Sequence, residues 1–157
     1  MMPTALDRIP APPSAKLLGW RLLDHDKRRG WVRVGFDGKA DFLNPAGFIQ
    51  GGIQAAMLDD TMGPAVWLMS DGRLYTATID MTMSFLAPAK PGPLFGEASV
   101  VRLGKTIAFL EARLLDGAGE VLARASASAR LLPAARALCE TKPKLPRPAN
   151  DLVAAAP

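Results

Sequence analysis

The sequence predicts an α+β domain in which an antiparallel sheet curls around one long, buried helix. Three observations predict this architecture. Residues 51–70 carry apolar side chains all round a helical wheel, which is typical of a buried helix. Strand-like segments lie on both sides of that helix in the chain, and the last three are joined by short turns with hairpin signals. A sheet that has a single helix must curl around it to bury it.

The strands are predicted in order along the chain. Residues 17–26 and 30–36 precede the helix, and the second of these alternates with period two. In residues 75–85, Tyr75, Ala77, Ile79, Met81, Met83 and Phe85 alternate with polar residues, so one apolar face is expected along the whole strand. After a loop at 88–93, residues 96–103, 106–115 and 120–132 should form three adjacent antiparallel strands. Alanines at alternate positions of the last strand would let the helix approach closely.

Two positions, Pro64 and Asp80, are expected to depart from this regular arrangement. Pro64 has no backbone N–H to donate to the carbonyl of Asp60, so a kink or an early break of the helix is expected there. Asp80 is expected to have a local partner on its strand.

The chain divides into three predicted parts. Residues 1–16 form a Pro/Ala-rich N-terminal lead-in, residues 17–132 form the single domain, and residues 133–157 form a Pro/Ala-rich tail without a helical or strand period. The chain has 157 residues, of which 49% are apolar and 22% charged, and this balance is typical of a globular protein.

Composition excludes several classes of site. One cysteine, Cys139, cannot form an intramolecular disulfide or a thiolate-rich metal centre. The single histidine, His25, lies in a charged stretch and is expected to be a solvated turn residue, so no metal site is predicted. The net charge of +4 comes from scattered basic residues without interleaved aromatics, which argues against nucleic acid and suits a small anionic ligand. No apolar run is long enough to span a membrane, and no secretion signal is recognised, so a cytoplasmic location is expected.

Asp59 and Asp60 are the residues that most need an explanation. They lie within the apolar helix, where a carboxylate is costly unless it is paired or used. Adjacent helical residues point about 100° apart, so the two cannot share a proton, and at most one is expected in a given site. A structural hydrogen bond or salt bridge is the commoner role of a buried aspartate. We assign that role to Asp60.

The motifs around this helix resemble those of hotdog-fold, PaaI-like acyl-CoA thioesterases. The family pattern is an Asn-x-x-Gly turn, then His-Gly-Gly opening the central helix, then an aspartate inside it. This chain has Asn44-Pro-Ala-Gly47, Gln50-Gly51-Gly52 and Asp59 at that spacing. Residues 78–90 and 102–112 are similar to the segments that follow in the family. The resemblance covers residues 17–132 and implies a hotdog fold, a curled antiparallel sheet wrapped around one long central helix.

The resemblance also implies roles for individual residues. Asp59 would be the general base or the nucleophile, and Asn44 would orient the water or the carboxylate. The backbone N–H of Gly51, at the positive end of the helix, would stabilise the oxyanion. Thr78, or Thr76 if the preceding loop differs in length, would place the water. Gln50 replaces the family histidine, and its amide can donate a hydrogen bond but cannot accept a proton at neutral pH.

Each of these residues also has an ordinary structural interpretation. Gly51 and Gly52 could serve close helix–sheet packing, Asn44 an Asx turn before Pro45, and Thr78 solvation or sheet pairing. Lys105, in a tight turn, could contact a CoA phosphate, although an exposed hairpin lysine explains it equally well.

The expected function is hydrolysis of an acyl- or aryl-acyl-CoA thioester. CoA would enter as part of the substrate, and no cofactor or metal is implied. The resembled family forms homodimers and often homotetramers with active sites at the dimer interface. Two alternatives stay open: a non-catalytic acyl-CoA binding protein of the same fold, and a hydratase or dehydratase, which usually pairs a histidine with an acid.

Overall fold

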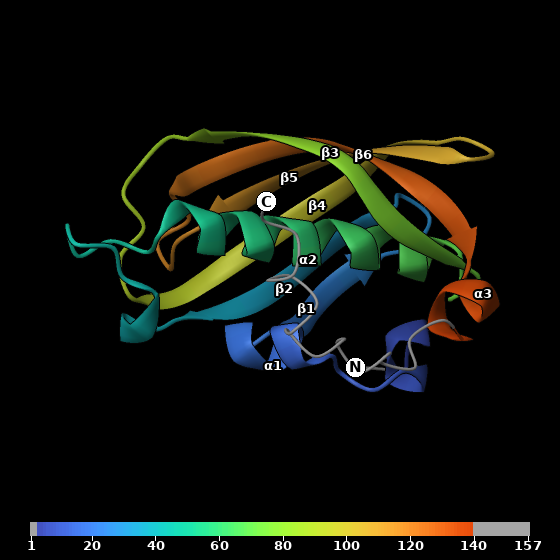
Figure 1. Ribbon diagram of the computed structural model, residues 1–157, viewed down its shortest axis with the longest axis horizontal. Helices are drawn as coiled ribbons and strands as arrows, with labels where there is room; N and C mark the ends of the chain where they lie inside the picture. The colour runs from blue at the N-terminus through green and yellow to red at the C-terminus, as the bar shows by residue number, and fades with distance from the viewer. Residues whose placement is uncertain (1–2, 140–157) are drawn as a thin grey trace, which may run out of the picture.

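Six strands form one antiparallel sheet that curls around a central helix, as Figure 1 shows. The structure is a computed structural model, and it describes residues 3–139. The strand order is β1-β2-β4-β5-β6-β3. The strands are β1 (Arg21–Asp26), β2 (Trp31–Gly38), β3 (Leu74–Phe85), β4 (Gly92–Leu103), β5 (Ile107–Leu115) and β6 (Val121–Pro133). The α+β architecture is therefore confirmed, and so is the adjacency of the last three strands.

The central helix α2 runs from Gly51 to Met69 and packs against the curled sheet, while Gly52, Ala56 and Asp59 are exposed. Met57, Leu58, Met62 and Val66 are at most 1% exposed and belong to the main core. Alternate alanines of β6 (Ala123, Ala125, Ala127 and Ala129) are buried in that same core. The helix predicted from position 51 to about 70 is confirmed.

Pro64 does not end α2, which continues to Met69. The predicted early break is therefore wrong. The carbonyl of Asp60, which Pro64 cannot bond, instead accepts a hydrogen bond from the Trp20 indole Nε1 at 3.0 Å. A side chain from the segment before β1 thus supplies the donor that the helix lacks.

Strand β3 contains a bulge that the sequence did not indicate. Thr78 pairs with Ala129, whereas Asp80 pairs with the next residue, Ser128, so Ile79 is the extra residue. The Asp80 carboxylate accepts hydrogen bonds from the backbone N–H and the hydroxyl of Ser128, at 3.0 and 2.9 Å. The expected local partner of Asp80 is therefore confirmed.

The bulge exchanges the two faces of β3. Before it, Thr76 and Thr78 face α2; after it, Met81 and Met83 pack against the core and Phe85 lies over Gly51. Ile79 itself is 58% exposed. The prediction of one continuous apolar face was wrong because it assumed an uninterrupted period of two.

The N-terminal part is helical and packed against the domain. It contains the 3₁₀ helix η1 (Ala5–Arg8) and helix α1 (Pro13–Leu18), which ends at Gly19 with a positive φ of 67°. The predicted strand at 17–26 therefore begins later, at Arg21. His25 lies in β1 and is half-buried, so the prediction of a solvated turn residue was wrong.

Two further short helices complete the fold. The 3₁₀ helix η2 spans Ala40–Phe42, and α3 spans Ala134–Cys139, where the sequence showed no period. The remainder of the predicted tail, residues 140–157, lies outside the described residues. Among residues 3–139, no helix is both long and apolar enough to cross a membrane.

The hydrogen bond from Trp20 to the Asp60 carbonyl yields a stability test. Trp20→Phe should lower the free energy of unfolding by about 1–3 kcal/mol, because a partly buried carbonyl loses its donor. Pro64→Ala supplies a backbone N–H for the same carbonyl, so Trp20→Phe should cost less in that background. Urea unfolding of the four proteins measures both costs, and equal costs in the two backgrounds would contradict this account.

Candidate active site

Asp59 and Thr78 meet at the junction of α2 and β3. The Thr78 hydroxyl donates a hydrogen bond to Asp59 Oδ1 at 2.7 Å. Thr78 reaches the helix because it is the last residue before the bulge on the helix-facing side of β3. Thr76, the alternative that the sequence left open, faces Gly63 one turn further along α2. The structure thus brings Asp59 together with Thr78.

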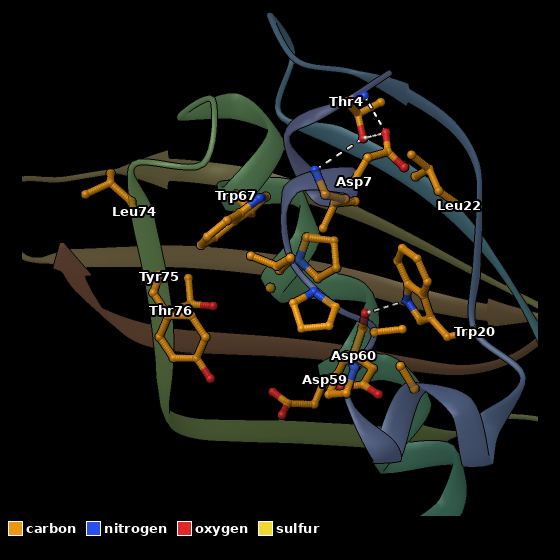
Figure 2. Close-up of a pocket in the computed structure, with 18 of the residues that line it drawn as sticks. Thr4, Asp7, Trp20, Leu22, Asp59, Asp60, Trp67, Leu74, Tyr75 and Thr76 are labelled. Atoms are coloured by element: carbon orange, nitrogen blue, oxygen red, sulfur yellow. Dashed lines mark hydrogen bonds between the residues drawn. The ribbon is translucent and has the colours of Figure 1, made fainter. Parts of the chain in front are cut away.

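This pair lies beside a cavity of about 910 Å³. Its walls come from α2, from the first half of β3 and from residues 3–22. Figure 2 shows Asp59 and Asp60 at one end, with Trp67 further along α2; Tyr75 and Thr76 lie on one side and Trp20 on the other. The lining is mostly proline, alanine, glycine, leucine, isoleucine and tryptophan, with seven polar residues: Thr4, Asp7, Asp59, Asp60, Tyr75, Thr76 and Thr78. Such a cavity suits an apolar ligand with its polar end at Asp59.

Asp60 lines the same cavity as Asp59. Both aspartates thus border one cavity, although at most one of them was expected in a given site. Among the described residues, Asp60 Oδ2 is buried without a hydrogen-bond partner, so a structural hydrogen bond does not explain it. Burial raises the pKa of Asp60 above its ordinary value, and the nearby charge of Asp59 raises that pKa further.

The N-terminus of α2 has unused backbone donors. The Oε1 of Gln50, the residue that caps the helix, accepts a hydrogen bond from the backbone N–H of Ile53 at 3.1 Å. The N–H groups of Ile53 and Gln54 also bond to the Gln50 carbonyl. Within the described residues, the N–H groups of Gly51 and Gly52 make no hydrogen bond. A Cβ on Gly51 would lie 3.0 Å from the Phe85 ring, so Gly51 also permits close packing.

Asn44 forms the Asx turn that was the ordinary interpretation of this residue. Its side-chain oxygen accepts hydrogen bonds from the backbone N–H groups of Ala46 and Phe48, at 3.0 and 3.2 Å. Lys105 is exposed in the turn between β4 and β5. Neither residue lines the cavity.

One protomer does not bring Asp59 and Gly51 together. They are eight residues apart on one helix, which at 1.5 Å per residue separates their backbones by about 12 Å. A single thioester carbonyl cannot contact both groups at that distance. Among the described residues of one chain, the site residues predicted from separate segments make one contact, that between Asp59 and Thr78, and Gln50 and Gly51 lie at the other end of α2.

Sequence reasoning did not identify the N-terminal residues that line the cavity. A readable signal was present: Thr4 and Asp7 form a capping box in which the Asp7 carboxylate accepts a hydrogen bond from the Thr4 backbone N–H at 2.6 Å. That pattern marks the start of a helix within the supposed lead-in.

Comparison with known proteins identifies the family. The model of the thioesterase superfamily matches residues 37–123, more than half of the chain. This chain belongs to the thioesterase superfamily. The match includes α2 with Asp59, and β3 with Thr78. The protein is a PaaI-like hotdog thioesterase, an enzyme that hydrolyses thioesters.

Individual relatives agree with this membership. A protein of Saccharolobus solfataricus named "Putative esterase" is 29% identical over 113 residues, which cover 72% of this chain and 79% of the relative. A Ralstonia eutropha JMP134 protein described as "putative thioesterase, phenylacetic acid degradation-related protein" is 31% identical, with a TM-score of 0.74, and the match covers 80% of this chain and 95% of that one. A Streptococcus mutans UA159 protein solved with bound acetyl-CoA shares the fold, at 20% identity and a TM-score of 0.64 over 73% of this chain and 89% of that one.

The raised pKa of Asp60 yields a pH-dependent stability test. A raised pKa means that the folded protein holds the Asp60 proton more tightly than the unfolded chain does. The free energy of unfolding should therefore fall as the pH rises above the ordinary value of 3.8 and through the raised pKa. Asp60→Asn stays neutral, so at pH 7 it should unfold at a higher temperature than wild type. The difference should disappear near pH 3. The exposed Asp41→Asn serves as control, and a difference that persists at pH 3 would contradict this assignment.

Proposed function

We propose that the protein hydrolyses an acyl-CoA to the free acid and CoA, with Asp59 as the reacting carboxylate. The hydrogen bond between Thr78 and Asp59, at one end of an apolar cavity, is the observation that carries the proposal. The cavity suits the acyl group, and the carboxylate lies where the thioester carbonyl would reach it.

The geometry is compatible with either of two routes for Asp59. As a general base, Asp59 accepts a proton from water while the water oxygen attacks the thioester carbon, and the proton passes to the departing thiolate. As a nucleophile, Asp59 attacks the carbon itself and expels the CoA thiolate; water then hydrolyses the mixed anhydride to the free acid and the Asp59 carboxylate, and the released proton passes to the thiolate. In both routes Thr78 holds Oδ1, which leaves Oδ2 of the same carboxylate to react.

The oxyanion would be stabilised by the N-terminus of α2 from a second protomer. The N–H of Gly51 is an unused donor at the positive end of the helix dipole. The Gln50 amide can add a donor through Nε2, since Oε1 caps the helix. In the same site, Asn44 would orient the water through its Nδ2, because its oxygen is engaged in the turn.

The edge strand β3 supports the pairing of protomers that this site needs. Only β6 pairs with β3 among the described strands, so its other edge has free backbone groups. Tyr75, Ile79 and Phe85 on this strand are 43%, 58% and 56% exposed. We propose a homodimer joined through β3, or a homotetramer built from such dimers.

CoA is the proposed carrier of the acyl group. The net charge of +4 favours a phosphorylated carrier, and Lys105 is a candidate contact for a CoA phosphate. The S. mutans protein of this fold binds acetyl-CoA. We propose that no cofactor or metal takes part and that the protein acts in the cytoplasm.

A second candidate function is acyl-CoA binding without turnover. Gln50 favours it, because glutamine cannot accept a proton where the family has histidine, and its oxygen is already engaged with Ile53. Intact acyl-CoA binding without thiol release in wild type would select this alternative.

Substitution of the two neighbouring aspartates tests the catalytic assignment. Asp59→Asn should lower kcat by about 10²–10⁴-fold, because the amide is neither a base nor a nucleophile. Asp60→Asn removes a carboxylate one position away and should cost less than tenfold. Thiol release from acetyl-, octanoyl-, palmitoyl- and phenylacetyl-CoA measures both effects. Equal losses in the two variants would contradict the role of Asp59.

A further inference from the structure

The cavity is elongated along α2. Asp59, Gly63 and Trp67 line it and lie at successive i, i+4 positions on one face of the helix. The distance from Asp59 to Trp67 along the helix is about 12 Å at 1.5 Å per residue. On the opposite side, Thr78 lies at the Asp59 end and Leu74 at the Trp67 end of β3. The cavity is therefore a channel that leads from the reacting carboxylate towards a tryptophan.

The floor of the channel is open at its midpoint because residue 63 is glycine. A Cβ at Gly63 would contact only the Thr76 hydroxyl, at 3.2 Å. Glycine destabilises the interior of a helix by about 0.5–1 kcal/mol relative to alanine. The space above Gly63 is part of the cavity. The glycine therefore lowers the stability of the helix, but its missing side chain leaves room for a ligand.

The outer wall of the channel is formed by residues 3–12, which we call the N-terminal strap. It is anchored at both ends. At one end, Ala5 packs with Trp67 and Ala134, and Arg8 pairs with Asp71 at 3.6 Å. At the other end, the strap continues into α1, whose Ala15 and Leu18 are buried. Most of the strap therefore crosses the cavity between two packed points.

The second half of the strap, residues 9–12, suits an apolar channel, whereas Thr4 and Asp7 of the first half add polar groups to the lining. Pro10, Ala11 and Pro12 line the cavity and are followed by Pro13 at the start of α1. Proline has no backbone N–H and a fixed φ, so this stretch is stiff and presents few unpaired donors to an apolar ligand. The strap lies before residue 37, where the match to the thioesterase superfamily begins, so it is a feature of this chain outside the matched region.

We propose that the N-terminal strap closes the acyl channel and selects medium-chain acyl groups, of about the length of octanoyl and decanoyl. Their apolar chains would lie between Gly63 and the Pro10–Pro12 stretch and end near Trp67. This inference rests on the proposed function, since it names the acyl group that the same site would accept.

The test narrows the channel from each of its two walls and measures how kcat/KM depends on the length of the acyl group. Ala11→Trp adds bulk from the strap, and Gly63→Leu adds bulk from α2. Ser14→Trp adds the same indole on the exposed surface of α1, outside the cavity, and serves as the matched control. The measurement is kcat/KM for acetyl-, octanoyl-, decanoyl- and phenylacetyl-CoA in wild type and the three variants, each checked by thermal unfolding.

Wild type should prefer octanoyl- and decanoyl-CoA. Ala11→Trp and Gly63→Leu should lower the ratio of kcat/KM for decanoyl-CoA to that for acetyl-CoA at least tenfold, and Ser14→Trp should leave this ratio unchanged. An equal ratio in Ala11→Trp and Ser14→Trp would overturn the proposal, because the strap would then not border the acyl group. This holds even if Gly63→Leu changes the ratio. A wild-type preference for phenylacetyl-CoA over decanoyl-CoA would also overturn it.

Binding of decanoate by calorimetry tests the channel without turnover. Wild type and Ser14→Trp should bind decanoate more tightly than butyrate, and Ala11→Trp should lose that difference. The absence of thiol release from every acyl-CoA would contradict the proposed function, while this binding result would still decide whether the strap closes the channel.

Discussion

Helix α2 is apolar on nearly all sides, so it is stable only where the curled sheet buries most of its large side chains. This requirement explains the curl of the sheet, the alanines of β6 and the use of Trp20 to satisfy a carbonyl that Pro64 leaves open. It also makes any carboxylate on the helix costly unless that carboxylate reaches the border of the core. Asp59 meets this condition because it is exposed, on the side where β3 is the edge strand, so the expectation of a buried carboxylate was wrong for Asp59.

The bulge in β3 connects this packing to the chemistry. The extra residue, Ile79, places Thr78 on the helix-facing side of the strand and Met81 on the same side further along. One strand therefore supplies both a hydroxyl for Asp59 and apolar residues for the core. The free edge of β3 and the 12 Å between Asp59 and Gly51 along α2 both support the proposed dimer, in which a second protomer would supply the helix N-terminus that one protomer cannot.

The sequence predicted the parts that depend on hydrophobic period. The helix at 51–70, the hairpin strands and the α+β class follow from apolar residues that repeat about every 3.6 residues in a helix and every 2 in a strand. It failed where a tertiary contact overrides the local pattern: Trp20 compensates for Pro64, and Asp80 holds the bulge through Ser128. The family resemblance placed Asp59 in one site with Thr78, or with Thr76, and the structure joins Asp59 to Thr78 by a hydrogen bond, whereas their catalytic roles stay predictions. The capping box of Thr4 and Asp7 could have indicated the first helical turn, but its packing against the cavity depends on segments far apart in the chain.

Mixed dimers test most directly whether the catalytic site is shared between protomers. Gly51→Pro removes one backbone N–H at a position where helices accept proline, and Asp59→Asn removes the carboxylate. Each variant alone should be nearly inactive. In a dimer that combines them, co-expressed with two affinity tags, one site keeps both Asp59 and Gly51, so about half of the wild-type activity per dimer should return. No recovery above the parent variants would contradict a site built from the Asp59 of one protomer and the helix N-terminus of the other.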